Sequence, residues 1–256
     1  MSSLPFTLDR TVVIQATPAT VFGFLTDTPL WAAWWGVGSE IEARPGGRMK
    51  IRYPDGTEAT GEVTEVRAPE RIVFTYGYTS GKFVPPGGSR VTIELEPLGA
   101  STRLRLTHEL DNEAVRDDHV QGWRYQLSLF SNVVADAVNA GASGVVDAWY
   151  DAWADTDAVS RERTLSRIAV PTLRFRDRYS NTDGVADLVA HIAGAQRFMP
   201  GIRMQRDGGV RHCQGTVLAD FVARSTDGQS RASGTNVFVF GADGRLEWVT
   251  GFMSVK

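Results

Sequence analysis

Four histidines and a few carboxylates are the residues of this chain that could transfer protons. The histidines stand at positions 108, 119, 191 and 212, and none follows another by the four residues of a helical zinc-binding pair. The chain has no phosphate-cradling glycine loop and no Gly-x-Ser-x-Gly motif, and its single cysteine is Cys213. We therefore expect no metal and no cofactor. If the chain is an enzyme, its chemistry is cofactor-free acid–base catalysis in an apolar cavity, which can raise a carboxylate pKa towards neutrality.

Three residues of the second half are the candidate catalytic groups: His212, Asp220 and Asp177. Period-two alternation within residues 202–225 places His212 and Asp220 on one strand face, and the opposite face is the cleaner apolar surface. The mixed face then lines a pocket or faces solvent. Asp177 follows a short predicted strand and is placed to reach a pocket mouth. An ordinary strand histidine is the alternative for His212.

Four further residues of the second half are candidate ligand contacts. Tyr179 lies beside Asp177, and Asn236 shares a strand face with two phenylalanines. His191 lies near the apolar stripe of a predicted helix, where a packing histidine bonded to a backbone carbonyl is the alternative. Trp149 lies on an apolar helix face, and a place in the core is its alternative.

The first half contains a set of aromatic residues: Trp34, Trp35, Tyr53, Tyr76, Tyr78 and Trp123. Most of them must belong to the core, because aromatic side chains dominate buried area. We expect Trp35, Tyr76 and Trp123 to line a cavity beneath a long helix and to contact a ligand. His108 is interpreted as a surface or helix-entry residue. Asp118 and His119 are interpreted as residues that open the long helix, where acids suit the positive helix end.

The elements that must position these residues change character along the chain. Residues 6–15 predict a strand, Thr17-Pro18 predicts a helix start, and a second short helix is expected from Pro29 to Trp35. Turn signals then separate strands expected at 48–53, 57–67, 71–79, 89–97 and 101–109. A long amphipathic helix follows, with Val120, Trp123, Leu127, Phe130 and Val134 on one face.

Small and polar residues at 139–144 suggest a linker, so we predict two domains, 1–140 and 141–256. In the second, helices come first and long strands last, with one β run at 202–225 broken near Gly208-Gly209. Both halves have an α+β layout.

Composition limits the partners. Hydrophobic residues make up 42 % of the chain, charged residues 22 %, and the net charge is −3. The basic residues are scattered, which argues against nucleic acid and anionic membranes. The N-terminus lacks the pattern of a secretory signal, and no stretch has the 18 or more apolar residues of a membrane span, so we expect a soluble cytoplasmic protein.

Short motifs run in order through about residues 8–137: Thr17-Pro18-Ala19-Thr20-Val21-Phe22, Trp34-Trp35-Gly36, Pro45-Gly46-Gly47, Gly61-Glu62-Val63, Pro69-Glu70-Arg71 and Gly122-Trp123. On these motifs the first half resembles the START-like helix-grip superfamily, also called SRPBCC, in the branch related to the activator of heat-shock protein 90 ATPase. The resemblance implies an antiparallel sheet curved around the long C-terminal helix, with a cavity between them.

A second series spans about residues 143–254: Trp149, Tyr150, Trp153, Gly184, His191-Ile192, Phe198-Met199-Pro200-Gly201, His212, Asp227-Gly228, Gly234-Thr235 and Asp243-Gly244-Arg245-Leu246. It resembles the SnoaL-like group of the nuclear-transport-factor-2-like superfamily. This implies an α+β cone, with helices closing a bent antiparallel sheet around a pocket. The superfamily includes polyketide cyclases, isomerases, epoxide hydrolases and binding proteins.

One position departs from the cyclase pattern. SnoaL-like cyclases often have an aspartate where this chain has Asn236 in Gly234-Thr235-Asn236. Asparagine cannot transfer a proton at neutral pH, so a cyclase-like mechanism would need His212, Asp220 or Asp177 instead.

Three functional hypotheses follow. The leading one is a bacterial protein of secondary or xenobiotic metabolism that takes a small apolar molecule, as a cyclase-like or isomerase-like enzyme or as a sequestering protein. The second is a co-chaperone-like interaction role. The third is one catalytic domain joined to one that mediates dimerisation, because domains of the second type often pair through their sheets. A homodimer is therefore expected as an option.

Overall fold

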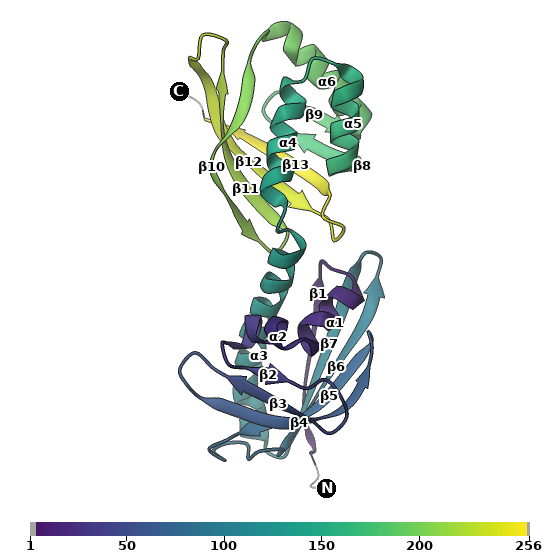
Figure 1. The fold of residues 1–256 in the computed structure, drawn as a ribbon, viewed down its shortest axis with the longest axis vertical. Helices are drawn as coiled ribbons and strands as arrows, with labels where there is room; N and C mark the ends of the chain where they lie inside the picture. Colours follow the sequence, from purple (N-terminus) through teal and green to yellow (C-terminus); the bar gives the residue numbers. More distant parts are fainter. Residues whose placement is uncertain (1–3, 255–256) are drawn as a thin grey trace. The chain divides into compact units, whose positions relative to one another are not determined.

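The computed structural model describes residues 4–254, which form two compact units (Figure 1). The first unit ends at Ala135 and the second begins at Asp136. We call them the N-terminal and the C-terminal domain and describe each by itself. The sequence-based boundary at residues 140 and 141 lies a few residues later and stays a prediction.

The N-terminal domain is built on one antiparallel sheet of seven strands in the order β1-β7-β6-β5-β4-β3-β2. The strands are β1 (Phe6–Ile14), β2 (Glu40–Ile41), β3 (Gly47–Arg52), β4 (Glu58–Arg67), β5 (Arg71–Tyr78), β6 (Ser89–Leu98) and β7 (Ser101–Leu110). Strands β3 to β7 therefore lie within two residues of the bounds expected from the turn signals. Glycine and proline turns set these bounds because the chain can reverse sharply there.

Two short helices precede most of the sheet. They are α1 (Pro18–Thr26) and α2 (Thr28–Trp35). Thr17 caps α1 by accepting a hydrogen bond from the Thr20 N–H at 3.3 Å, and Asp27 caps α2 by accepting one from the Leu30 N–H at 3.1 Å. These caps confirm the predicted helix starts and orient the tryptophans of α2.

The long helix α3 (Glu113–Val138) packs against α2. Trp123, Leu127, Phe130 and Val134 recur at three- and four-residue steps and are buried, as the periodicity predicts. Phe130 lies edge-on to Trp34 with ring centroids 4.7 Å apart, and Gln126 Nε2 donates to the Trp34 carbonyl. The helix-grip architecture expected for this domain is confirmed.

The C-terminal domain has three helices and a six-stranded sheet in the order β10-β11-β12-β13-β8-β9. The helices are α4 (Ala142–Ala154), α5 (Ala158–Ile168) and α6 (Val185–Phe198), and the strands are β8 (Ala169–Arg176), β9 (Asn181–Asp183), β10 (Arg203–Cys213), β11 (Thr216–Arg224), β12 (Ser230–Phe240) and β13 (Leu246–Met253). The α+β class is confirmed. The sheet is mixed rather than wholly antiparallel, because β8 runs parallel to β13.

The long β run at 202–225 turns at a different place from the one predicted. Its reversal is at Gln214 and Gly215, which both have positive φ angles (46° and 82°), as a tight two-residue hairpin turn requires. The Gly208-Gly209 pair instead lies in a register shift between Arg206 and Val210 of β10. A hairpin at 214–215 changes which residues of β10 and β11 share a face.

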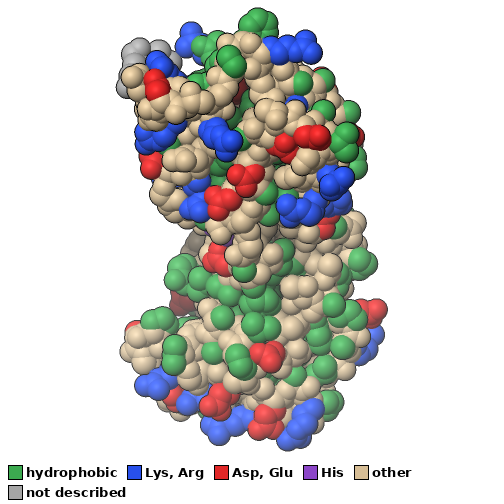
Figure 2. Space-filling view, turned by 45° about the horizontal axis from the view of Figure 1, so that its top comes forward, with side chains coloured by type: hydrophobic (Ala, Val, Ile, Leu, Met, Phe, Trp, Pro, Cys, Tyr) green, Lys and Arg blue, Asp and Glu red, His purple; other side chains and the backbone are tan. Residues whose placement is uncertain are grey.

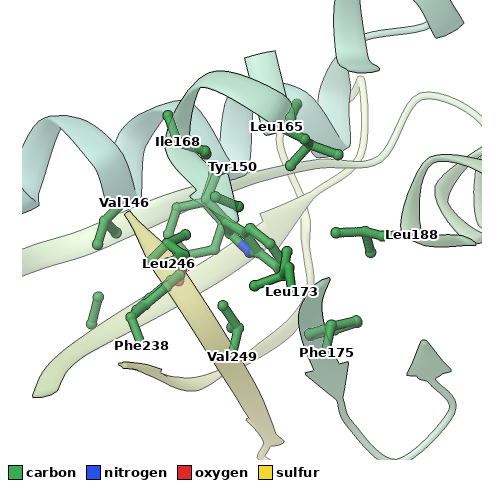
Figure 3. Packing of buried hydrophobic residues seen from close by; sticks show 14 of the residues in the cluster. Val146, Tyr150, Leu165, Ile168, Leu173, Phe175, Leu188, Phe238, Leu246 and Val249 are labelled. Carbon is green, nitrogen blue, oxygen red and sulfur yellow. The ribbon is translucent and has the colours of Figure 1, made fainter. Parts of the chain in front are cut away.

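The core of the C-terminal domain lies between α4 and the sheet. Figure 3 shows Val146 and Tyr150 of α4 pointing towards Phe238, Leu246 and Val249 of the strands. Within residues 4–254, no single helix is long and apolar enough to cross a membrane; only α3 and α4, taken as a bent pair, pass that test of length and composition.

Candidate functional site

The N-terminal domain contains a cavity of about 480 Å³ between its sheet, α2 and α3. Trp34 and Trp35 of α2 line one side, and Trp123 of α3 lines another. Phe83 and Tyr125 also line it, yet they are 61 % and 69 % exposed, so they mark its mouth. On the visible face of this domain, hydrophobic side chains gather into a patch with charged side chains at its margin (Figure 2).

Three tyrosines belong to the cavity wall. The hydroxyls of Tyr53 and Tyr76 are hydrogen-bonded at 2.9 Å, and the ring of Tyr78 lies 5.6 Å from that of Tyr76. Burial raises the pKa of the Tyr53 and Tyr76 hydroxyls above the ordinary range of a phenol. Both side chains therefore remain neutral at physiological pH, as donors and acceptors of hydrogen bonds.

A hydrogen-bonded chain runs behind this wall. Trp123 Nε1–H donates to His108 Nδ1 at 3.0 Å, so His108 carries its proton on Nε2 and donates to Ser89 Oγ at 2.8 Å. The Ser89 hydroxyl then donates to the Tyr76 carbonyl at 2.9 Å. Burial, with a smaller contribution from the nearby His119, lowers the pKa of His108 to about 3. This histidine is neutral and orients Trp123.

Two nitrogen atoms of the lining residues have no hydrogen-bond partner among the described residues. They are Trp35 Nε1 and His119 Nε2, and both are buried. His119 Nδ1–H donates to the Val115 carbonyl at 2.7 Å, which leaves Nε2 as an acceptor in the neutral imidazole. Such orphaned polar atoms are rare, and one accepted explanation is a water or ligand that completes them.

The residues that form this cavity match a known protein family. Residues 15–135 match the family model described as "Activator of Hsp90 ATPase homolog 1-like protein". These residues form an activator of Hsp90 ATPase homolog 1-like domain. We call it the activator-like domain. No curated protein matches the chain at a significant level.

Solved structures similar to parts of the chain include both expected kinds. One is a putative isomerase of the SnoaL-like family from Agrobacterium tumefaciens, with 23 % identity over 44 % of this chain and 96 % of that chain and a TM-score of 0.42. Another is the Aha1 dimer from Colwellia psychrerythraea, with 18 % identity over 48 % and 90 % and a TM-score of 0.43. A third is an HSP90 activator from Plasmodium falciparum, with 23 % identity over 46 % and 86 % and a TM-score of 0.39.

The structure brings the three ligand candidates of the activator-like domain together: Trp35, Tyr76 and Trp123 all line the cavity. The interpretation of His108 as a surface residue is wrong, because its side chain is fully buried. His108 shares one face of β7 with the buried Leu104, Leu106 and Leu110, which lie at two-residue steps from it. The period-two pattern of this strand therefore indicated that His108 is buried.

Most of the other lining residues were not predicted to belong to a site, and Asp118, His119 and Phe83 are among them. Asp118 and His119 lie more than one turn inside α3, which begins at Glu113, rather than opening it. No sequence signal indicated Phe83, which lies in the loop between β5 and β6 with a φ of 67°. A bulky residue in the left-handed region is uncommon.

The catalytic candidates of the C-terminal domain lie apart. Because β10 and β11 form a hairpin, His212 pairs with Val217 and shares its buried face, whereas Asp220 pairs with Thr235 on the opposite face. His212 is held on both nitrogens, by Asp136 Oδ1 at 2.5 Å and the Gly215 N–H at 3.0 Å. The prediction that His212 and Asp220 share one strand face is therefore wrong.

Asp220 and Asp177 are engaged in local hydrogen bonds. Thr235 Oγ1 donates to Asp220 at 2.5 Å, and the Tyr179 N–H donates to Asp177 at 2.7 Å. Asp177 does approach Asn236, since a Cβ built on Gly251 would lie 3.1 Å from Asp177 Cβ and 3.0 Å from Asn236 Oδ1. Acid–base chemistry by these residues stays a prediction.

The other candidates of this domain have structural neighbours. Trp149 is fully buried and packs on Phe175 and Phe238. His191 Nε2 is 2.7 Å from Ser180 Oγ, rather than bonded to a backbone carbonyl.

Tyr179 and Asn236 lie in contrasting places. Tyr179 is 72 % exposed beside a hollow of about 190 Å³, whereas Asn236 is buried. Burial raises the pKa of the neighbouring Tyr150 hydroxyl. Within the described residues, no group of three or more His, Cys, Asp or Glu side chains could hold a metal ion.

Proposed function

We propose that the activator-like domain binds a small, mostly apolar molecule in the cavity under α3. The observation that carries the proposal is the cavity of about 480 Å³. It is enclosed by aromatic side chains from α2, α3 and the sheet, and it has orphaned nitrogens on Trp35 and His119. Ligand pockets in proteins typically measure about 300–1,000 Å³ and combine apolar walls with a few polar groups.

The proposal is of binding rather than turnover. The tyrosines at the wall stay neutral, and both nitrogens of His108 are used in hydrogen bonds. None of these three side chains supplies a base. Cyclase-like or isomerase-like catalysis, the bacterial setting, the cytoplasmic location and a homodimer remain predictions from the sequence.

A co-chaperone role is the alternative suggested by the family description. Such a role would favour a large apolar contact surface outside the cavity. The exposed large hydrophobic residues of this domain are Val13, Val37, Phe83, Leu98 and Tyr125. Two of them form the cavity mouth, and the others lie on separate elements, so the geometry favours ligand binding.

Gly122 offers a direct test, because it lines the cavity and a Cβ built on it meets no atom within 4 Å. Leucine at this position would fill part of the cavity and also favour the helix. The probe is the neutral dye N-phenyl-1-naphthylamine, whose fluorescence rises in apolar surroundings. We expect the full-length protein to bind it and Gly122→Leu to bind at least tenfold more weakly.

The matched control is Gly144→Leu. Gly144 is another helical glycine with open space around it, in α4 of the C-terminal domain. Its affinity for the dye should equal that of the unmodified protein. Absence of dye binding, or equal binding by Gly122→Leu, would refute a ligand site in this cavity.

A further inference from the structure

We propose that the ligand of this cavity is an organic cation carrying an alkylated ammonium group. This inference rests on the proposed function and names the class of molecule that the cavity walls select. It follows from the charges that face the cavity, from the arrangement of its rings and from the cost of burying an anion there.

The described residues that line the cavity offer no lysine or arginine side chain to pair with an anionic ligand. Neither lysine nor arginine is among the described lining residues, and Asp118 is the one carboxylate. The neutral phenols of Tyr53 and Tyr76 add no charge, and His108 behind the wall is also neutral. Among the lining side chains that the structure describes, a ligand therefore meets one carboxylate and no lysine or arginine.

Neighbouring aromatic rings of the cavity wall lie at steep angles to one another. The ring of Trp35 is 5.9 Å from Tyr53 at 89° and 5.7 Å from Trp123 at 75°. This is the edge-to-face arrangement that aromatic side chains prefer, and all three of these rings line the cavity. A cation over a ring face is attracted by the ring quadrupole, most strongly to tryptophan and when water is excluded.

The mouth has one aromatic side chain that already contacts a cation of this chain. The exposed Phe83 lies edge-on to Tyr78, and the Lys82 ammonium is 4.8 Å from the centroid of its ring. A ring at the entrance thus already binds a cation of this chain. Lys82 is exposed, so solvent screens its charge towards a ligand.

An anionic ligand would lose its hydration without gaining a cationic partner, and Asp118 would repel it. A neutral hydrocarbon would gain only the burial of its apolar surface. A cation with an apolar alkyl surface gains the same burial. It is also attracted by the faces of the aromatic rings and by the negative charge of Asp118. Its diffuse charge also makes it less costly to dehydrate than a primary ammonium.

Three probes of similar shape separate these cases: phenyltrimethylammonium, tert-butylbenzene and benzenesulfonate. Each is titrated against the full-length protein with bound N-phenyl-1-naphthylamine at pH 8 and low salt. We expect the ammonium compound to displace the dye at a concentration at least tenfold lower than tert-butylbenzene, and the sulfonate not to displace it. Equal or better displacement by tert-butylbenzene or benzenesulfonate overturns the cation proposal while the binding function stands. Failure of the dye itself to bind refutes the proposed function instead.

Asp118 has a matched neighbour in Asp117. Both are exposed carboxylates of α3, but Asp117 pairs with Arg116 at 2.7 Å and does not line the cavity. Asp118→Asn should weaken phenyltrimethylammonium about twofold to fivefold and leave tert-butylbenzene unchanged, because an exposed charge is partly screened. Asp117→Asn should change neither affinity. Equal effects of the two variants would assign the loss to general surface charge and overturn the role of Asp118.

Tyr125→Leu tests the rings separately from the carboxylate. The side chain is exposed at the mouth, so the change should be tolerated in folding. It keeps an apolar group and removes a ring face. The preference for phenyltrimethylammonium over tert-butylbenzene should fall about twofold to threefold, and an unchanged preference would contradict a contribution of this ring.

Discussion

The two domains use similar residues to build different interiors. Each places a helix that carries tryptophan and tyrosine side chains against a sheet with aromatic side chains. In the C-terminal domain, Trp149 and Tyr150 of α4 both contact the ring of Phe238, and all three side chains are buried. In the N-terminal domain, Trp35 and Trp123 contact each other but leave a cavity of about 480 Å³ beside them.

The difference lies in what stands between the rings. In the N-terminal domain, Gly122 of α3 supplies no side chain at the cavity, and the polar groups of Tyr53 and Tyr76 bond to each other across the wall. In the C-terminal domain, apolar side chains such as Val146, Leu173 and Val249 fill the corresponding spaces in the core cluster. The number of aromatic residues therefore does not by itself predict a cavity.

The largest effect is expected from removing a ring of the closed core. Trp149→Ala should destabilise the C-terminal domain by about 3–5 kcal/mol, since a buried Trp is replaced by a cavity. Tyr125→Ala, at the mouth of the N-terminal cavity, should change stability by less than about 0.5 kcal/mol. Urea unfolding followed by hydrogen exchange on separate peptides measures both domains. A small effect at Trp149 would show that the C-terminal interior is as open as the N-terminal one.

A smaller effect is expected from pH, and it concerns the polar interior of the N-terminal domain. Burial lowers the pKa of His108 from 6.5 to about 3, so below pH 6.5 the unfolded chain binds a proton that the folded domain does not. The stabilisation is complete above pH 6.5 and is lost as the pH falls towards 3. Between pH 6.5 and about pH 4 the loss should be roughly 3 kcal/mol.

The variant His108→Gln isolates this contribution, because other acidic groups titrate in both proteins. Its free energy of unfolding should be lower at pH 7 but should depend less on pH over the same range. Hydrogen exchange of β7 peptides at several pH values measures the difference. Parallel pH profiles for the two proteins would show that His108 is not the group responsible.

The smallest effect is expected at the cavity mouth, where Phe83 has a φ of 67°. Asparagine tolerates the left-handed region better than other side chains, because it can bond to its own backbone. Phe83→Asn should therefore be more stable than Phe83→Leu by about 1 kcal/mol. Thermal unfolding of the two variants compares them directly, and the reverse order would indicate that side-chain contacts, not backbone conformation, decide stability here.

Much of the N-terminal fold could be predicted because local signals coincide there. Glycine and proline turns separate the strands, and caps such as Thr17 begin the helices. The cavity residues Trp35, Tyr76 and Trp123 followed from aromatic type and from the expected sheet around a helix. His119 and Asp118 were missed because the position at which α3 begins decides which way they point.

The C-terminal site candidates show where such reasoning ends. His212 and Asp220 share a face only if residues 202–225 run as one strand, and the hairpin at Gln214 and Gly215 separates them. Gln214 gave no turn signal of its own, because glutamine rarely takes a positive φ. Pairing register depends on contacts between distant residues, so a period-two pattern cannot supply it across an unrecognised turn.

Gly122 has a practical consequence for anyone who engineers this protein. A glycine inside a helix costs about 1 kcal/mol relative to alanine, and the neighbouring space accepts a larger side chain without a clash. A library screened only for heat resistance would therefore enrich replacements at this position early. The selected variants would be more stable proteins with a smaller cavity. Such a screen should therefore be paired with a selection for ligand binding.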